Sequence, residues 1–316
     1  MGRSSRSGPR DPNGSRSSQL LDGTSSEPID VEIWLQVLIN GVLLGGLYGL
    51  VATGLALVFG VMGIINVAHG DLMVVGATGT FLLFSTWGLP PYVGILAIIP
   101  VMFVMGLGIQ RFLLERINRA EELMSLLLLF GLGIAISQST ASLVGAEFFS
   151  VPYWSGAISI GPLFASRSLL YAFLLAIAVA SALFYLLAKT PSGRAIRATA
   201  MAPDLAASVG IDVRWVRMLT FGVGTVLTGI AGGLMVTTQG LNPLSGEVFL
   251  LIAFAACVLG GLGSLYGALT AGIIIGVIEV STAILIDTQS SQLAIYIIFI
   301  IMLLVRPTGI FGMRRA

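Results

Sequence analysis

The chain has 316 residues, of which 56% are hydrophobic and only 10% are charged, and its mean hydropathy is +0.98. A soluble domain carries about 25% charged residues, so this composition excludes an ordinary soluble protein and predicts a polytopic protein of the lipid bilayer. The net charge of +1 provides no basic excess for binding nucleic acid.

The first 32 residues differ in composition from everything that follows. Residues 1–32 are rich in Ser, Gly, Pro and Arg and show no apolar periodicity. Such a segment cannot bury enough apolar surface to offset its ordering entropy, so we expect a disordered N-terminal tail. It also lacks the apolar core of a signal peptide, and we expect no cleavage.

Nine apolar runs follow, and most are long enough to cross about 30 Å of hydrocarbon as a helix. They predict an all-α polytopic membrane protein with about eight to nine transmembrane helices. The runs are Ile33–Phe59, Leu72–Trp87, Tyr92–Phe112, Leu123–Val144, Leu169–Ala188, Met218–Val236, Phe249–Leu259, Ala268–Ile286 and Leu293–Val305. Gly145–Ser168 is expected to be an interfacial loop because it combines turn residues with aromatic ones.

A glycine-rich break, Gly60–Gly76, separates the first two runs and contains the only histidine, His69. Asn66, Gly70 and Asp71 lie beside it. Unpaired polar groups are costly in hydrocarbon and are tolerated where the backbone breaks or lines an enclosed cavity. We therefore expect a broken-helix hinge. A hydrogen-bonded structural role is favoured for His69 and Asp71, with a proton relay or ligand site as the alternative.

A second glycine-dense break lies between the seventh and eighth runs. Its characteristic residues are Gly260, Gly261, Gly263 and Ser264. Paired interruptions of apolar helices point to a translocation path, although closely packed helix turns would give the same pattern. Glu279, in the middle of the eighth run, is a further pathway residue by this logic because ionisable groups inside the membrane are usually functional. The alternative is a neutral or paired structural group.

The longest polar insertion, Lys189–Arg217, predicts two short helices. One begins near Ser192, a possible N-cap, and ends at Met201; the second runs from Pro203 to a glycine stop. In the second helix, Leu205 and Val209 lie four residues apart on one side. A short amphipathic helix of this kind fits a groove on a partner; a solvated loop helix is the alternative. The residues expected to form this surface are Gly193, Arg194, Arg197, Asp204, Ala206, Ala207 and Gly210.

Together the insertion and the two breaks resemble the permeases of ABC importers for branched-chain amino acids, specifically the shorter of two permease types. Permeases for urea and short amides are near relatives. The resemblance covers residues 33–312 as one permease domain, with residues 313–316 as a C-terminal tail, and identifies 189–217 as the coupling segment. It implies a second permease subunit, two cytosolic ATP-binding subunits and an extracytoplasmic substrate-binding protein. Met201 departs from the polar or acidic residue that relatives often carry there.

The chain contains no phosphate-binding Gly-x-x-x-x-Gly-Lys-[Ser/Thr] segment, so energy has to come from a partner. It offers no cluster of Cys and His to hold a metal, and no cofactor is expected. An intramembrane protease built on His69 and Ser264 lacks a convincing nucleophile setting. A secondary transporter or channel is the more serious alternative, and the sequence does not identify the substrate.

The distribution of arginine and lysine predicts the orientation. Cytoplasmic loops carry the excess of these residues, and the basic stretches Arg111–Arg119 and Lys189–Arg217 are separated by two spans. Both therefore face the cytoplasm of a bacterial inner membrane. Counting spans from there places the C-terminus inside and the N-terminus outside.

Overall fold

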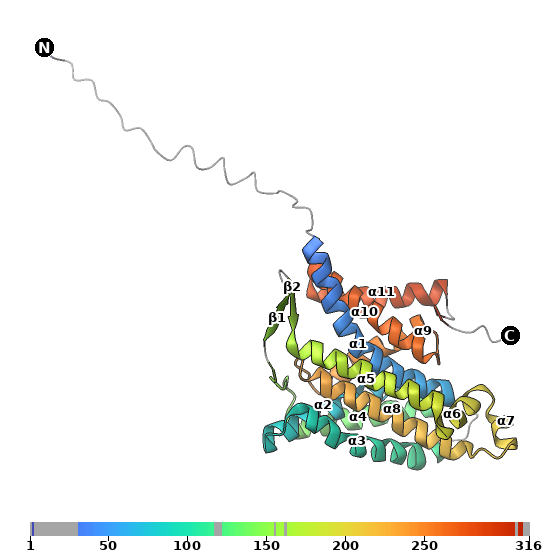
Figure 1. Cartoon of the computed structure of the whole chain (residues 1–316). Coiled ribbons are helices and arrows are strands. Elements are labelled where there is room, and N and C mark those ends of the chain that lie inside the picture. Colours follow the sequence, from blue (N-terminus) through green and yellow to red (C-terminus); the bar gives the residue numbers. More distant parts are fainter. Residues whose placement is uncertain are drawn as a thin grey trace.

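The computed structural model describes residue 2 and residues 31–116, 122–154, 156–160, 163–306 and 309–311. Within them the chain is a bundle of helices with one small sheet, so the expected all-α membrane architecture is confirmed apart from that sheet (Figure 1). The predicted tails fall almost wholly outside the described residues, except that α1 already includes Val31 and Glu32. The elements are α1 (Val31–Met62), α2 (His69–Trp87), α3 (Pro91–Gly108), a π turn (Ile109–Leu113), a 3₁₀ turn (Leu114–Arg116), α4 (Glu122–Val144), β1 (Ala157–Ile160), β2 (Leu163–Ser166), α5 (Arg167–Lys189), α6 (Pro191–Met201), α7 (Pro203–Ser208), α8 (Val213–Met235), α9 (Ser245–Gly260), α10 (Leu265–Leu285) and α11 (Thr288–Val305).

Each of the nine apolar runs forms a helix, but not all of these helices match a full membrane span. Among the described residues, seven helices are long and apolar enough to cross a bilayer: α1, α3 with its extension to Arg116, α4, α5, α8, α10 and α11. The α9 helix has only 16 residues. The α2 helix carries His69 and Asp71 in its first turn, which lowers its hydropathy.

The centre of the bundle is formed by α1 and α8, whose most apolar stretches are each 83% buried. α1 packs on α10 through opposed glycines. A Cβ atom built on Gly276 would lie 2.3 Å from the Cα atom of Gly45, and one built on Gly272 would lie 2.3 Å from that of Gly49. Small residues allow such close backbone approach, which drives helix association where lipid removes the usual hydrophobic driving force.

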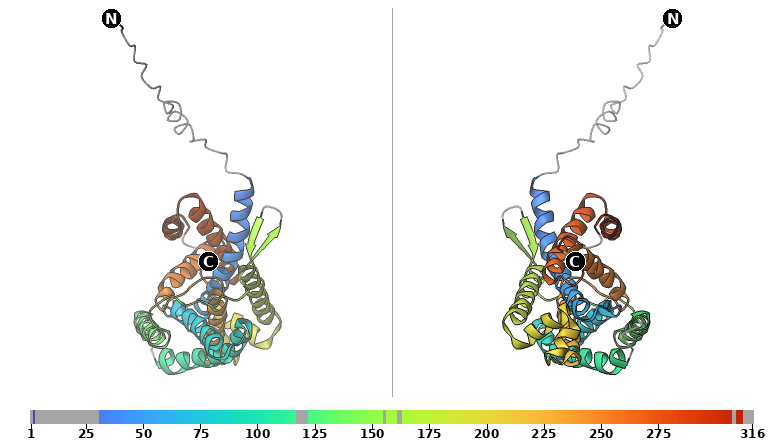
Figure 2. Two further views of the ribbon diagram at one scale, coloured as in Figure 1. Left: turned by 90° about the vertical axis from the view of Figure 1, so that its left-hand side faces the viewer. Right: turned by 90° about the vertical axis from the view of Figure 1, so that its right-hand side faces the viewer.

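The α2 helix is wedged between α8 and α9 by the same means. A Cβ atom on Gly76 would lie 2.2 Å from the carbonyl oxygen of Gly229, and one on Gly70 would lie 1.8 Å from that of Gly246. The α3 and α11 helices lie on opposite sides of the bundle (Figure 2).

The segment expected to be an interfacial loop contains a β-hairpin that the sequence analysis missed. β1 and β2 pair antiparallel, with Ala157 opposite Ser166. The hairpin is held against α1 by Gln36, whose side-chain oxygen accepts the Phe164 N–H at 2.7 Å while its amide donates to the Phe164 carbonyl. Trp154 packs on Tyr171 with ring centroids 4.5 Å apart, as the expected aromatic character of this region implies.

Candidate functional site

The first break lies between the end of α1 at Met62 and the start of α2 at His69. Gly63 adopts a φ of +69° and donates its N–H to the Phe59 carbonyl at 2.8 Å. The main-chain oxygen of Asn66 accepts the His69 N–H at 3.1 Å. The Asn66 side chain is buried, and its Oδ1 atom has no hydrogen-bond partner among the described residues.

His69 is fully buried and joins three helices. Its Nε2 atom lies 3.0 Å from the Val51 carbonyl oxygen of α1 and 2.8 Å from the Thr228 hydroxyl of α8. The Thr228 hydroxyl also donates to the Gly224 carbonyl at 3.0 Å. Because Val51 and Thr228 lie well inside their helices, α2 begins within the bundle rather than at its surface.

Asp71 lies in space left by two glycines of other helices. A Cβ atom on Gly133 of α4 would approach its Oδ2 atom to 2.4 Å, and one on Gly246 of α9 would approach Oδ1 to 2.6 Å. The side chain is half-buried, and no hydrogen bond joins it to His69 in the described part of the chain. Asp71 and His69 are neighbours in sequence that face different helices.

The second break begins where α9 ends at Gly260. Gly261 and Gly263 adopt φ values of +97° and +84°. Ser264 then caps α10, its hydroxyl accepting the Gly267 N–H at 3.1 Å. Near the C-terminus, Ile310 donates its N–H to the Leu259 carbonyl at 2.8 Å, so the end of the described chain closes over this break.

The structure brings the two breaks into contact. A Cβ atom on Gly60, just before the end of α1, would lie 3.4 Å from the Cα atom of Gly263. A methyl group on Gly60 would thus be in ordinary van der Waals contact with Gly263, so two backbone segments about 200 residues apart in sequence lie close together. Neither break by itself signals this contact, because it is a property of how α1 packs on α9 and α10.

Glu279 lies away from both breaks. It is on α10, where its carboxyl group faces the Tyr48 hydroxyl of α1 and interacts electrostatically with Tyr296 of α11. Its Oε2 atom is buried and has no hydrogen-bond partner among the described residues. The structure therefore separates Glu279 from the residues with which the sequence analysis grouped it.

The coupling segment begins with α6, whose start differs slightly from the prediction. Thr190, not Ser192, is the N-cap: its hydroxyl accepts the Gly193 N–H at 3.0 Å, because Pro191 occupies the first helical turn. Gly193 presses on the end of α5, where a Cβ atom would lie 2.4 Å from the Leu187 carbonyl oxygen. The Arg197 guanidinium donates to that same oxygen. These contacts fix α6 to α5.

The second short helix, α7, runs from Pro203 to Ser208 and packs against the rest of the chain at Ala206. This residue is 4% exposed, and its carbonyl accepts the Ile211 N–H at 3.0 Å. Gly210 follows at a φ of +86°.

The next span, α8, starts at Val213, earlier than the predicted Met218, because Asp212 caps α8 by accepting the Trp215 N–H at 3.0 Å. Arg214 and Arg217 are consequently helical.

Three apolar side chains of the coupling segment point away from the bundle. Met201 is 86% exposed, Leu205 69% and Val209 76%. Arg194, Asp204 and Ala207 are exposed as well. A helix pair that is fixed at its base and exposes apolar side chains at its tip is suited to docking.

Comparison with known proteins gives a consistent family. A family model described as "Branched-chain amino acid transport system / permease component" matches residues 37–305. The chain is 30% identical to the high-affinity branched-chain amino acid transport system permease protein LivH of Escherichia coli K12, covering 88% of this chain and 96% of that protein.

Two further relatives extend the comparison. The probable branched-chain amino acid transport permease protein LivH of Methanocaldococcus jannaschii is 30% identical, covering 87% of this chain and 92% of the relative. The permease protein LivM of Escherichia coli K12, of the high-affinity branched-chain amino acid transport system, is 26% identical, covering 85% of this chain and 68% of LivM. The similarity thus spans nearly all the helices described above.

Proposed function

Since the chain belongs to the family of branched-chain amino acid transport system permease components, we propose that it is the transmembrane permease subunit of an ATP-driven importer for branched-chain or other apolar amino acids. The names and full-length similarity of the relatives support the substrate class. The absence of a phosphate-binding loop from the sequence supports ATP hydrolysis on separate subunits.

The observation that carries the proposal is the exposed apolar tip of the coupling segment. This tip exposes the apolar side chains of Met201, Leu205 and Val209 to water. Their burial in a groove of a partner would stabilise the complex by about 25 cal/mol for each Å² of apolar surface removed from water. We assign this surface to a cytosolic ATP-binding subunit. Met201, Leu205 and Val209, with the exposed Arg194, Asp204 and Ala207, form the docking surface in this proposal. Gly193, Arg197, Ala206 and Gly210 hold the two short helices in place.

The other partners follow from the same proposal. The similarity to both LivH and LivM, two permease proteins of one transport system in Escherichia coli, supports pairing with a second permease subunit. Two ATP-binding subunits and an extracytoplasmic substrate-binding protein complete the importer. It lies in the bacterial inner membrane, with the C-terminus in the cytoplasm and the N-terminus outside.

A contiguous set of contacts links the coupling segment to the breaks. α6 packs against α5, α1 and α8. α1 ends at the first break and touches the second through Gly60 and Gly263. In this mechanism, closure of the ATP-binding subunits moves residues 193–210, and α1 carries the motion to the hinges at Asn66 and Gly261, which switches the permease between two access states.

Gly210→Val tests this mechanism. No atom lies within 4 Å of a Cβ built on Gly210, so the substitution acts through its strained positive φ and not through a clash. Substrate uptake and binding of the ATP-binding subunits are expected to fall together. Gly131→Val is the matched control, because Gly131 also has open space but lies within α4. Normal uptake by the Gly210 variant would show that the coupling motion runs elsewhere.

Reconstitution separates an ATP-driven importer from a secondary transporter. Vesicles containing this chain, its second permease and the ATP-binding subunits should accumulate leucine only with ATP and the binding protein. Excess isoleucine or valine should compete, whereas urea and acetamide should not. Uphill uptake by this chain alone on an ion gradient would overturn the proposed function.

A further inference from the structure

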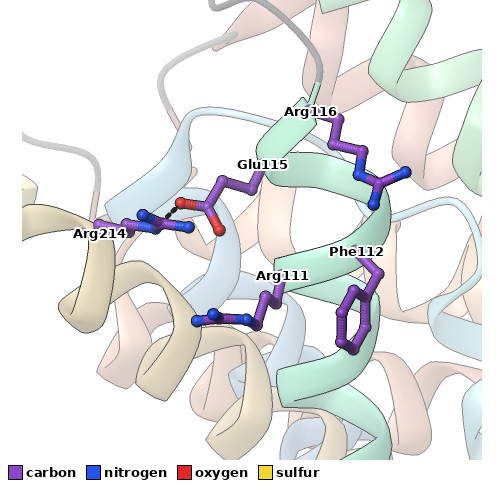
Figure 3. Close-up of a pocket in the computed structure, with 5 residues that line it drawn as sticks. All are labelled: Arg111, Phe112, Glu115, Arg116 and Arg214. Carbon is purple, nitrogen blue, oxygen red and sulfur yellow. Dashed lines mark ion pairs between the residues drawn. The ribbon is translucent and has the colours of Figure 1, made fainter.

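An open pocket of about 460 Å³ lies between the end of α3 and the start of α8, away from both breaks and from the short helices α6 and α7. Its lining residues are Arg111, Phe112, Glu115, Arg116 and Arg214. The first four belong to the π and 3₁₀ turns that extend α3 (Figure 3). π turns are rare and are found frequently at functional sites.

The pocket carries an excess of positive charge. Glu115 forms an ion pair with Arg214, which neutralises the only acidic side chain of the lining. Arg111 and Arg116 are exposed, and neither forms an ion pair with any residue that the structure describes. Figure 3 shows Arg111 and Glu115 extending toward Arg214, while Phe112 and Arg116 extend from the other side of the same turns. Among the described residues, the charges of Arg111 and Arg116 are therefore left for an anion.

The pocket lies where two apolar spans end, Pro91–Arg116 and Val213–Met235. Phe112, which lines the pocket, is 58% exposed, and Trp215, the residue after Arg214 in the sequence, is 51% exposed. Tryptophan is enriched where a spanning helix leaves the hydrocarbon. Anionic lipid headgroups are available where spanning helices end.

The pocket also faces outward from the bundle on one side. Only 28% of the most apolar stretch of the α3 span is buried inside the chain, against 83% for α8. A ligand can therefore keep its apolar part beside the exposed surface of α3 while its charged part enters the pocket. Phe112 lies on that apolar side.

We propose that this pocket binds the phosphate group of an anionic phospholipid. Arg116, which lies on the same side of the turns as Phe112, contacts the phosphate oxygens, for which the planar, permanently charged guanidinium is well suited, and Arg111 adds positive charge to the pocket. Phe112 contacts the acyl chains. Basic pockets between transmembrane helices are a recognised setting for anionic lipid headgroups, and the Glu115–Arg214 ion pair joins the two helices that form the pocket walls.

The test measures lipid binding by the purified full-length chain in detergent, using native mass spectrometry and thermal unfolding. Phosphatidylglycerol should remain bound and raise the melting temperature, whereas phosphatidylcholine and inorganic phosphate should not. In Arg111→Gln/Arg116→Gln, phosphatidylglycerol binding should weaken by about thirtyfold, because each basic residue near an anionic membrane surface contributes ~1 kcal/mol.

Two further variants make the result specific. Arg306→Gln removes an arginine at the end of α11 and should leave binding unchanged. Glu115→Gln removes the acidic group of the pocket and should strengthen phosphatidylglycerol binding. Equal stabilisation by inorganic phosphate would assign the pocket to a soluble anion and overturn the lipid proposal. An equal loss of phosphatidylglycerol binding in Arg306→Gln would also overturn it. So would an Arg111→Gln/Arg116→Gln variant that binds phosphatidylglycerol normally but no longer co-purifies with the ATP-binding subunits. These readouts do not depend on transport.

Discussion

At the scale of the residue, His69 shows how a polar side chain is accommodated inside an apolar bundle. Its partners are a backbone carbonyl on α1 and a hydroxyl on α8, which are neutral groups. Within the described residues, no carboxylate or second histidine is hydrogen-bonded to the ring. A proton relay needs a successor to which the proton can pass, so this geometry favours a structural role.

The structural role predicts separate effects on stability and on pH dependence. His69→Ala should destabilise the purified protein by ~3 kcal/mol, because it leaves a cavity and unpaired polar groups. His69→Gln should recover part of this loss and transport with the same pH profile as the unsubstituted protein. Thermal unfolding and uptake between pH 5.5 and about 8, a range that spans the ordinary pKa of histidine, are the measurements.

Thr228→Val provides the companion variant, since it removes the hydroxyl partner at nearly constant volume. It should cost ~1 kcal/mol of stability, the usual net value of one hydrogen bond. A shifted pH profile in His69→Gln or Thr228→Val would instead favour the proton-relay interpretation.

Glycine contacts between α1 and α10 make a second prediction at this scale. Gly276→Ala places a methyl group where the Gly45 backbone already lies, so it should destabilise the chain by ~1–3 kcal/mol through overpacking. Gly131→Ala adds the same methyl group to α4 in open space and should be neutral or slightly stabilising. Melting temperatures of the two variants in detergent measure the difference, and equal values would contradict the close α1–α10 crossing.

The sequence could identify these residues but not their partners. The isolated polar cluster in the first break singled out His69. The groups that His69 contacts lie 18 residues before it and 159 residues after it. Such pairings are set by tertiary packing and leave no local signal in a single sequence.

At the scale of the element, the short helices α6 and α7 are well predicted because their signals are local. A possible N-cap at Ser192 predicted the first helix, and Pro203, the glycine after the second helix and an apolar pair four residues apart predicted the second. The N-cap assignment to Ser192 failed because proline at the first helical position moves the cap to the preceding threonine. The β-hairpin was missed because each strand has only four residues, too few to show an alternating pattern.

Docking through α7 predicts the effect of a charge at its tip. Leu205→Glu or Val209→Glu should leave the permease folded, because both side chains are exposed. Either should weaken binding of the ATP-binding subunits by ~2 kcal/mol or more, since a charge would be buried without a partner. Co-purification and ATPase stimulation are the readouts. Gln289→Glu, an exposed position at the start of α11, is the control and should bind normally.

At the scale of the whole molecule, the arrangement of the helices makes the two breaks a single structural unit. α1 contributes one break and contacts the other, and it also contacts α6 of the coupling segment. Composition and run length predicted the membrane class and the number of apolar helices. They could not predict that the breaks touch, or that α2 starts inside the bundle, because both depend on helix crossings between distant segments.

The proposed orientation predicts which surfaces reagents can reach from outside the cell. Cys257 is 1% exposed, so it should not react, and single cysteines can be added to the natural chain. Gln289→Cys lies in the first turn of α11, on the proposed outer side, and should react with a membrane-impermeant maleimide in intact spheroplasts. Ser208→Cys is equally exposed, at the end of α7, but should react only after the membrane is opened. Labelling of Ser208→Cys in intact spheroplasts would place the coupling segment outside, where no ATP-binding subunit could dock, and would reverse the topology.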